Sequence, residues 1–188
     1  MSFDLDEVRS AMRALGTVPQ IIAWQPEDWP PLYNVLLGFW QRLTSSNPIT
    51  LRYSSVLIFL PSLALMFVMT RRITKSERAA WSATLVYAAL SYSTFLSLYL
   101  RAYSLALTLL PILLLLTDIY FRASRSRQWL WAIAVGVTIA GLFYTTYTAI
   151  FAFVWVGLYT LICYPRRIWR WFPPIGLSFL LVLPELVR

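Results

Sequence analysis

Residues 53–70 read YSSVLIFLPSLALMFVMT, an apolar run without a charged side chain, and RRITKSER (71–78) follows directly. A helix needs about 20 mostly apolar residues to cross the hydrocarbon core of a bilayer, and this run approaches that length. Four cations close it: Arg71, Arg72, Lys75 and Arg78. Because cationic side chains anchor spanning helices at the membrane surface, the stretch predicts a transmembrane helix that ends at this cluster.

The composition of the whole chain points the same way. Its 188 residues are 59% hydrophobic and only 13% charged, whereas roughly a quarter of the residues are charged in soluble domains. The sequence therefore predicts an integral membrane protein. The formal charge of +8 is held in short clusters between apolar runs. That pattern is typical of membrane topology, so we expect no nucleic-acid partner.

A single cysteine, Cys163, and the absence of histidine limit the chemistry. They exclude a disulfide framework, a Cys/His zinc site and acid–base catalysis by histidine. Proton transfer would fall to Asp, Glu, Tyr or Lys. The carboxylates could bind a divalent ion, but nothing in their spacing requires one, so no metal or other cofactor is predicted.

Further apolar runs follow at residues 79–121, 128–163 and 173–187. The first is too long for one span and is expected to break near Arg101. The second is expected to hold two spans joined by a turn at YTTYT (144–148). The predicted fold class is therefore an all-α integral membrane protein with about six transmembrane helices.

The basic residues predict the topology. The clusters at 71–78, 122–127 and 166–170 hold ten of the sixteen Lys and Arg residues. All three clusters fall on one side if the helices alternate, and the positive-inside rule places that side in the cytoplasm. The predicted location is the plasma (inner) membrane, with residues 1–50 and the C-terminus outside.

Residues 1–50 form a separate extracytoplasmic segment in this interpretation, ahead of a transmembrane domain at 51–188. Asp4 and Glu7 have the spacing of a capping box for a helix that runs to about Leu15. A second short helix is predicted from residue 31 to about residue 43. Both helices are amphipathic and too short to span, so they are expected to lie at the membrane interface.

Arg101 is the most informative charged residue, because no other charge lies between Arg78 and Asp118. A charge near the centre of a spanning helix costs about 3 kcal/mol or more, so Arg101 needs an anionic partner. It either extends to lipid headgroups or binds a phosphate in an outward-facing cavity. Asp118 is interpreted as structural, since Arg122 lies four residues on.

The remaining acids have ordinary explanations when taken alone. Asp6 and Glu7 would complement the dipole in the first turn of a helix. Asp28 stands before Pro30-Pro31, where an acid is common turn chemistry.

Taken in order, several segments resemble the GT-C class of membrane glycosyltransferases. They are DLDEVRSAM (4–12), PEDWPPLYNVLLGFWQRL (26–43), SLYLRAYSLALTLL (97–110) and GLFYTTYTAIFAFVWVGLYTL (141–161). The likeness is to the bacterial protein mannosyltransferase and aminoarabinose transferase group. Those enzymes have an Asp-Glu pair in the first outer loop, an acid before a Pro-Pro segment, and Arg-x-Tyr at the outer end of a later helix.

The resemblance implies transfer of a sugar from a polyprenyl-phosphate donor to an acceptor hydroxyl on the outer side of the membrane. It matches Asp6 to the catalytic base and Glu7 to its partner. Asp28, Arg101 and Tyr103 match substrate-binding positions, with Arg101 beside the lipid phosphate. The implied partners are membrane lipid, the polyprenyl-phosphate sugar donor and other membrane subunits.

The chain also departs from the family pattern. Tyr99 stands where members often have an acid, and Trp29 and Thr146 stand where they have His. The family's first transmembrane helix, its later helices and its C-terminal domain have no counterpart, so the chain resembles part of such an enzyme or a shortened relative. The alternative is a non-catalytic GT-C-derived scaffold or accessory subunit of a membrane complex. A transporter is a third class, but the spans lack the paired charges it would need.

Overall fold

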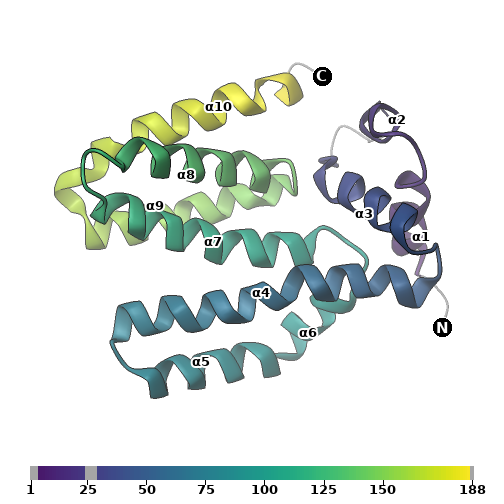
Figure 1. Ribbon diagram of the computed structural model, residues 1–188, viewed down its shortest axis with the longest axis horizontal. Coiled ribbons are helices and arrows are strands. Elements are labelled where there is room, and N and C mark those ends of the chain that lie inside the picture. Colours follow the sequence, from purple (N-terminus) through teal and green to yellow (C-terminus); the bar gives the residue numbers. More distant parts are fainter. Residues whose placement is uncertain (1–3, 24–28, 187–188) are drawn as a thin grey trace.

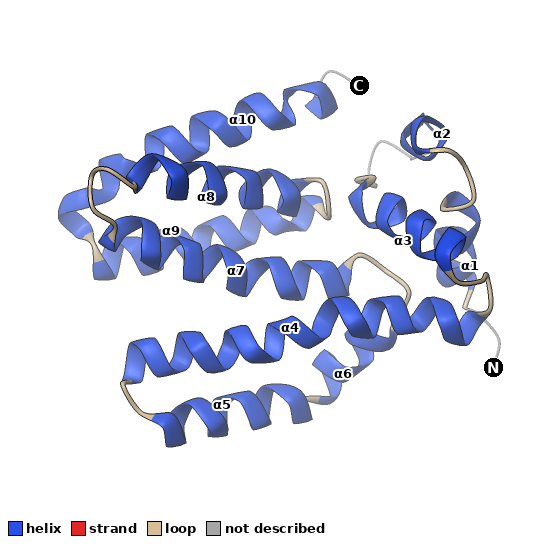
Figure 2. Ribbon diagram, viewed as in Figure 1, coloured by secondary structure: helices blue, strands red, loops and turns tan. Residues whose placement is uncertain are grey.

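The computed structural model describes residues 4–23 and 29–186, and every regular element in that part is helical (Figure 2). The all-α fold class is confirmed. The N-terminal segment contains three helices rather than the two predicted: α1 (Leu5–Arg13), α2 (Val18–Ala23) and α3 (Leu32–Leu43). The missed helix α2 has a readable signal, because the Gln20 side chain accepts a hydrogen bond from the backbone N–H of Thr17 at 2.9 Å, as in a capping box.

The rest of the described chain forms seven further α-helices and two 3₁₀ segments (Figure 1). The helices are α4 (Pro48–Thr74), α5 (Glu77–Ala89), α6 (Ser91–Leu98), α7 (Tyr103–Arg122), α8 (Gln128–Phe143), α9 (Ile150–Cys163) and α10 (Phe172–Leu186), and the 3₁₀ segments are η1 (Tyr147–Ala149) and η2 (Pro165–Trp171). The predicted breaks near Arg101 and at residues 144–148 are confirmed. A further break separates α5 from α6, where the Thr94 hydroxyl donates to the Ala88 carbonyl at 3.2 Å.

Two of these helices, α4 and α7, are long and apolar enough to cross a membrane. At about 1.5 Å per residue, their 27 and 20 residues extend roughly 40 and 30 Å. The helices α5, α8, α9 and α10 have 13 to 16 residues and fall short of that length. The six-span arrangement therefore stays a prediction. Asn47 caps α4 through its side chain, so this helix begins before the predicted domain boundary at residue 51.

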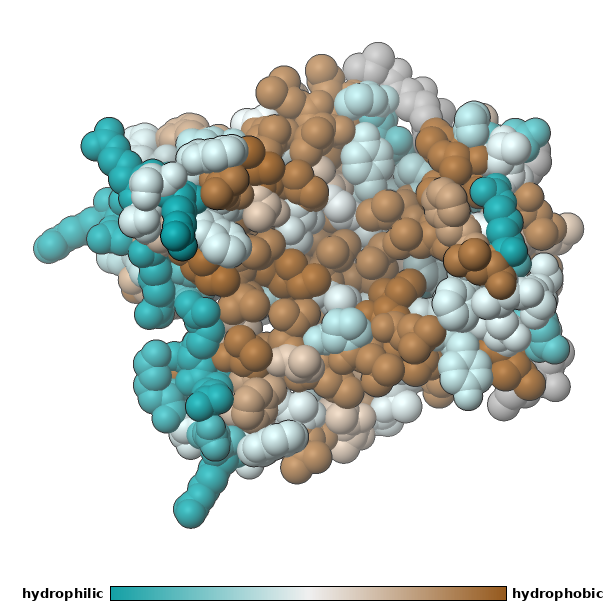
Figure 3. All heavy atoms as spheres, in the orientation of Figure 1, coloured by the Kyte–Doolittle hydropathy of each residue, from teal (hydrophilic) through white to brown (hydrophobic). Residues whose placement is uncertain are grey.

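The three basic clusters lie at one end of the molecule. The α4–α5 turn, the α7–α8 turn and η2 meet on the left of Figure 1, whereas α1–α3 and the C-terminal end of α10 lie on the right. The face drawn in Figure 3 is brown through its middle and teal toward both ends. The three clusters therefore share one end of the molecule, and the side of the membrane that this end faces stays a prediction.

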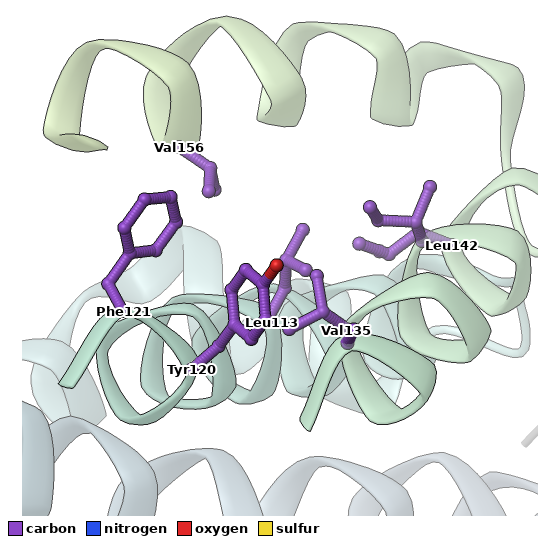
Figure 4. Close-up of a cluster of buried hydrophobic side chains, with 8 residues drawn as sticks. Leu113, Tyr120, Phe121, Val135, Leu142 and Val156 are labelled. Carbon is purple, nitrogen blue, oxygen red and sulfur yellow. The ribbon is translucent and has the colours of Figure 1, made fainter. Parts of the chain in front are cut away.

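The larger of two buried apolar clusters is built from side chains of three helices. Leu113, Tyr120 and Phe121 of α7 pack with residues of α8 and α9, and the buried members are drawn in Figure 4. Phe121 stacks on Tyr164 with ring centroids 5.1 Å apart, which brings the segment after α9 onto α7. The cluster lies between the two ends of the molecule and holds α7, α8 and α9 together.

A buried carboxylate joins the helices at the basic end. Asp118 is 2% exposed and receives the predicted contact from Arg122 at 2.9 Å. It also pairs with Arg72 of α4 at 2.9 Å. The hydroxyls of Tyr159 and Tyr164 donate to it at 3.0 and 2.7 Å. Asp118 thus links α4, α7 and α9. The sequence predicted only its contact with Arg122, four residues further along the chain.

We expect Asp118→Asn to lower the free energy of unfolding in detergent by about 1–3 kcal/mol, because it removes the buried charge that accepts from two partly exposed arginines and two tyrosine hydroxyls. Circular dichroism and intrinsic fluorescence during thermal unfolding measure this. The matched control is Glu77→Gln, which breaks the exposed Arg71–Glu77 pair at the same end and should change stability by no more than about 1 kcal/mol. Equal effects of the two variants would contradict the assignment of Asp118 as the central contact.

Candidate functional site

A buried ion pair attaches α1 to the bundle. Glu7 is 1% exposed, and Arg52 of α4 donates to it through Nε at 3.0 Å and Nη2 at 2.5 Å. The backbone N–H of Leu100, in the α6–α7 loop, donates to the same carboxylate at 3.2 Å. The backbone N–H of Asp4 does so at 3.2 Å and completes the predicted capping box. Glu7 therefore fixes α1 against both α4 and the loop that carries Arg101.

The surroundings of Glu7 keep it ionised. Burial alone would raise the pKa of this carboxyl. The hydrogen bonds from Arg52, Asp4 and Leu100 favour the charged form and overcome that effect, so its pKa is lowered. Nearby, the Tyr99 hydroxyl donates to Asp4 at 2.9 Å. Burial and the Asp4 carboxylate raise the pKa of Tyr99 to about 12, which keeps the phenol protonated as a donor.

The polar side of α3 packs on the chain around α1. Gln41 donates to the Ala11 carbonyl at 3.0 Å. Gly38 lies so close to this chain that a Cβ atom there would be 2.7 Å from the Ala14 carbonyl oxygen. The apolar stripe of α1 faces outward instead, with Leu5 and Met12 exposed. This inverted arrangement, polar inside and apolar outside, is the one that an interfacial helix presents to lipid.

A cavity of about 150 Å³ opens beside α1 and α3 at this end of the molecule. Its lining is rich in polar side chains: Ser10, Trp29, Tyr33, Asn34, Arg101, Tyr103, Thr145 and Thr146, with Pro30 and Ala102. The Tyr33 hydroxyl is 2.9 Å from Ser55 Oγ, which ties the floor to α4. Burial raises the pKa of Tyr33 well above its usual value, so it stays a neutral hydrogen-bonding group.

Asp6 and Arg101 meet beside this cavity. Arg101 Nη2 is 3.2 Å from Asp6 Oδ2, and the two side chains are 17% and 37% exposed respectively. Arg9 adds a second cation 3.7 Å from Asp6. The buried Arg101 Nη1 has no hydrogen-bond partner among the described residues. One arm of the guanidinium is therefore paired with a carboxylate, and the other has no acceptor in the described part of the chain.

Trp29 lies between two guanidinium groups. Arg101 stands 4.1 Å from the ring centroid and Arg13 stands 4.5 Å from it. A cation over an indole face is attracted by the ring quadrupole, by about 0.5–1 kcal/mol at exposed sites and more when desolvated. Trp29 thus helps to hold Arg101 at the cavity wall.

The structure brings together Asp6, Arg101 and Tyr103 of the predicted site residues. Tyr103 lines the cavity and is partly exposed. Glu7 is not part of the cavity lining. Its carboxylate accepts hydrogen bonds from Arg52 and from the backbone N–H groups of Leu100 and Asp4. Asp28 falls outside the described residues.

Several cavity residues were not predicted. Ser10 follows Asp6 by one helical turn and donates to its carbonyl at 3.1 Å, and Asn34 belongs to the polar side of α3. Both residues lie on the polar side of a short amphipathic helix, so treating all residues on those sides as site candidates would have found them. Thr145 and Thr146 come from the turn after α8, more than 100 residues from α1, and no local pattern joins segments so far apart.

No group of three or more Asp, Glu, His or Cys residues that could hold a metal ion occurs within residues 4–23 and 29–186. Chemically, the site offers a carboxylate that can accept a proton, a guanidinium that can stabilise an anion, and hydroxyl and amide groups that can bind a polar ligand.

Comparison with known proteins finds no matching family model, no matching curated protein and no matching solved structure. The site is therefore interpreted from its own geometry.

We expect Gly38→Ala to destabilise the α1–α3 contact by about 1–3 kcal/mol, because the added Cβ would meet a backbone oxygen at 2.7 Å. Thermal unfolding measures the loss. The control is Gly157→Ala in α9, where a Cβ meets nothing within 4 Å. That variant should be neutral or slightly stabilising, since Ala favours helix over Gly by up to about 1 kcal/mol. A neutral Gly38→Ala would contradict the close packing of α3 on the chain around α1.

The lowered pKa of Glu7 predicts a specific acid sensitivity. The stability that it contributes is present above its ordinary pKa of 4.5 and is lost as the pH falls through the lower folded value. We expect Glu7→Gln to lower the free energy of unfolding by about 1–3 kcal/mol near neutral pH, because the buried carboxylate that accepts from Arg52 and from two backbone N–H groups loses its charge. We also expect a smaller further loss in the variant than in the wild type when the pH falls below 4.5. If the free energies of unfolding of the wild type and of Glu7→Gln fell by the same amount as the pH is lowered, this role of Glu7 would be ruled out.

Proposed function

We propose that the chain is a membrane glycosyltransferase, or part of one, that transfers a sugar from a polyprenyl-phosphate donor to an acceptor hydroxyl on the outer side of the membrane. The observation that carries the proposal is the Asp6–Arg101 pair, 3.2 Å apart, beside a polar cavity. Such a reaction needs one group that takes a proton and one that receives a leaving phosphate.

The proposed placement is in the plasma (inner) membrane with the basic clusters in the cytoplasm. The support is α4 and α7, which are long enough to cross, and the brown belt between the charged ends in Figure 3. The shorter apolar helices α5, α8, α9 and α10 complete about six spans, with local thinning of the bilayer accommodating their length. Residues 1–50, the cavity and the C-terminus then lie on the outer side.

In the proposed reaction, the acceptor oxygen attacks the anomeric carbon of the bound sugar. Asp6 takes the hydroxyl proton as that bond forms, and the bond between the anomeric carbon and the phosphate oxygen breaks. The electron pair leaves with the polyprenyl phosphate, whose added charge Arg101 stabilises. Arg101 Nη1 has no hydrogen-bond partner in the described part of the chain, so this nitrogen is free to donate to a phosphate oxygen as the sugar donor binds in the cavity.

The other predicted residues take supporting roles in this proposal. Glu7 positions α1, and with it Asp6, through its contacts with Arg52 and Leu100. Tyr103 lies where it can donate to the sugar or phosphate, and Asp28 keeps its predicted role in binding the substrate. A cavity of about 150 Å³ matches a benzene-sized group, so it would hold one end of the headgroup while the polyprenyl chain stays in lipid.

A non-catalytic scaffold or accessory subunit is the second candidate, and one feature favours it. Asp6 and Arg101 neutralise each other in this structure, as a pair retained only for packing would. In that case the exposed apolar side chains of α9, such as Trp155 and Ile162, would pack against other membrane subunits.

The test uses the full chain in lipid nanodiscs supplied with polyprenyl-phosphate-linked mannose or aminoarabinose and an acceptor alcohol. Released polyprenyl phosphate is measured by mass spectrometry. We expect Asp6→Asn to lower the rate by about 10²-fold or more while the donor still binds. Arg101→Gln should lower both binding and rate, and Glu77→Gln, at the far end, should change neither.

Unchanged turnover in Asp6→Asn would refute the role of Asp6 as base. Donor binding by the wild type without release of polyprenyl phosphate would favour the scaffold instead.

A further inference from the structure

A second concave surface lies at the basic end of the molecule, far from the Asp6–Arg101 site. It runs between the start of α8 and the segment from η2 into α10, two helices that pack side by side (Figure 1). Its volume is about 670 Å³, more than four times that of the cavity near Asp6. We call it the α8–α10 groove, and its walls include Arg125, Trp129, Ile133, Trp169, Arg170 and Leu177.

Two cations stand at the groove without a described counter-ion. Arg125 lies in the turn between α7 and α8, and Arg170 lies in η2. No acidic side chain of residues 4–23 and 29–186 is within ion-pair distance of either. Asp118, the acid of α7, is already paired with Arg72 and Arg122. The groove therefore has an excess of positive charge.

The backbone beneath these cations is held in place. The Tyr120 hydroxyl donates to the Arg170 carbonyl at 2.7 Å. The guanidinium of Arg170 contacts the Phe121 carbonyl at 3.4 Å through Nη1, and Arg167 donates to the same carbonyl at 2.9 Å. Since η2 is tied to α7 in this way, Arg170 is presented from a fixed segment.

The rest of the groove is apolar and aromatic. Trp129 and Trp169 are 60% and 74% exposed, and Trp169 stacks on Phe172 with centroids 5.8 Å apart. Ile133 continues the wall one turn beyond Trp129, and Val137 extends the exposed apolar stripe of α8 by another turn. Cations at one end and an apolar track leading from them fit an amphipathic anion.

We infer that the α8–α10 groove binds an anionic glycerophospholipid of the cytoplasmic leaflet. Its headgroup phosphate pairs with Arg125 and Arg170, the indoles lie at the level of the glycerol esters, and an acyl chain follows Ile133 and Val137. A zwitterionic lipid fits less well, because its ammonium group would meet the two guanidiniums. A small soluble anion would leave the apolar track unused. The inference rests on the proposed membrane placement and is independent of sugar transfer.

Native mass spectrometry of the full chain in detergent tests this, with phosphatidylglycerol and phosphatidylcholine of identical acyl chains as the probes. We expect the wild type to prefer phosphatidylglycerol. The double variant Arg125→Gln/Arg170→Gln should lose about tenfold or more of that preference, since each cation near an anionic lipid surface contributes severalfold. The matched control is Arg127→Gln/Arg166→Gln, which removes the same charge at the same end from residues outside the groove lining.

Replacing Arg170 also removes its contact with the Phe121 carbonyl and could disturb the fold. The single variant Arg125→Gln keeps that contact, and it should lose severalfold of the preference. An equal loss in the control pair would overturn the inference, because the preference would then reflect diffuse charge. No preference in the wild type would overturn it as well. Recovery of the chain outside the carbonate-resistant membrane fraction would refute the membrane placement itself, whereas a membrane-bound chain without lipid preference refutes only the groove.

Discussion

The contact between the buried Glu7 carboxylate and Arg52 is the constraint on which the end of the molecule that holds α1–α3 depends. α1 has only nine residues and presents its apolar stripe outward, so apolar packing alone does not fix it to the bundle. The Glu7 carboxylate accepts hydrogen bonds from Arg52 of α4 and from the backbone N–H of Leu100 in the α6–α7 loop. Since Arg101 follows Leu100 directly, the contact that docks α1 also sets the distance between Asp6 and Arg101.

Each end of the molecule contains a buried carboxylate that pairs with arginine, but the surroundings of the two differ. At the basic end, Asp118 collects two arginines and two tyrosine hydroxyls and is closed to solvent. At the end that holds α1–α3, two acids pair with two arginines. The Glu7 carboxylate is buried against Arg52, whereas the Asp6 carboxylate is partly exposed where it meets Arg101 beside the cavity. A partly exposed carboxylate next to a fixed ion pair is an arrangement that a ligand can approach without loosening the fold.

Most of the fold could be predicted from the sequence, because it depends on local signals. The apolar runs, the capping box of Asp4 and Glu7 and the breaks near Arg101 and at residues 144–148 all correspond to observed features. Helix α2 was missed, although Thr17 and Gln20 carry a capping signal. The shortness of α8 and α9 was also not predicted, since hydropathy gives the extent of an apolar run but not the residues at which a helix ends.

The site was less predictable, because its members come from distant segments. The family resemblance brought Asp6, Arg101 and Tyr103 together, and these residues do lie near one another. Nothing in the sequence indicated that Glu7 would accept hydrogen bonds from Arg52, which lies 45 residues further along the chain. Nor did it indicate that Trp29 would stack on Arg101. Such contacts follow from how the helices pack.

In the proposed function, Arg101 receives the phosphate of a polyprenyl lipid, and solid-state NMR measures this contact directly. The protein, labelled with ¹⁵N-arginine, is reconstituted with polyprenyl phosphate in a bilayer of an uncharged, phosphorus-free glycolipid, and ³¹P–¹⁵N dipolar dephasing is recorded. The account predicts a phosphorus–guanidinium contact at ion-pair distance that disappears in Arg101→Lys. A contact that persists unchanged in Arg101→Lys, or is absent from the wild type while the lipid is bound, would contradict it.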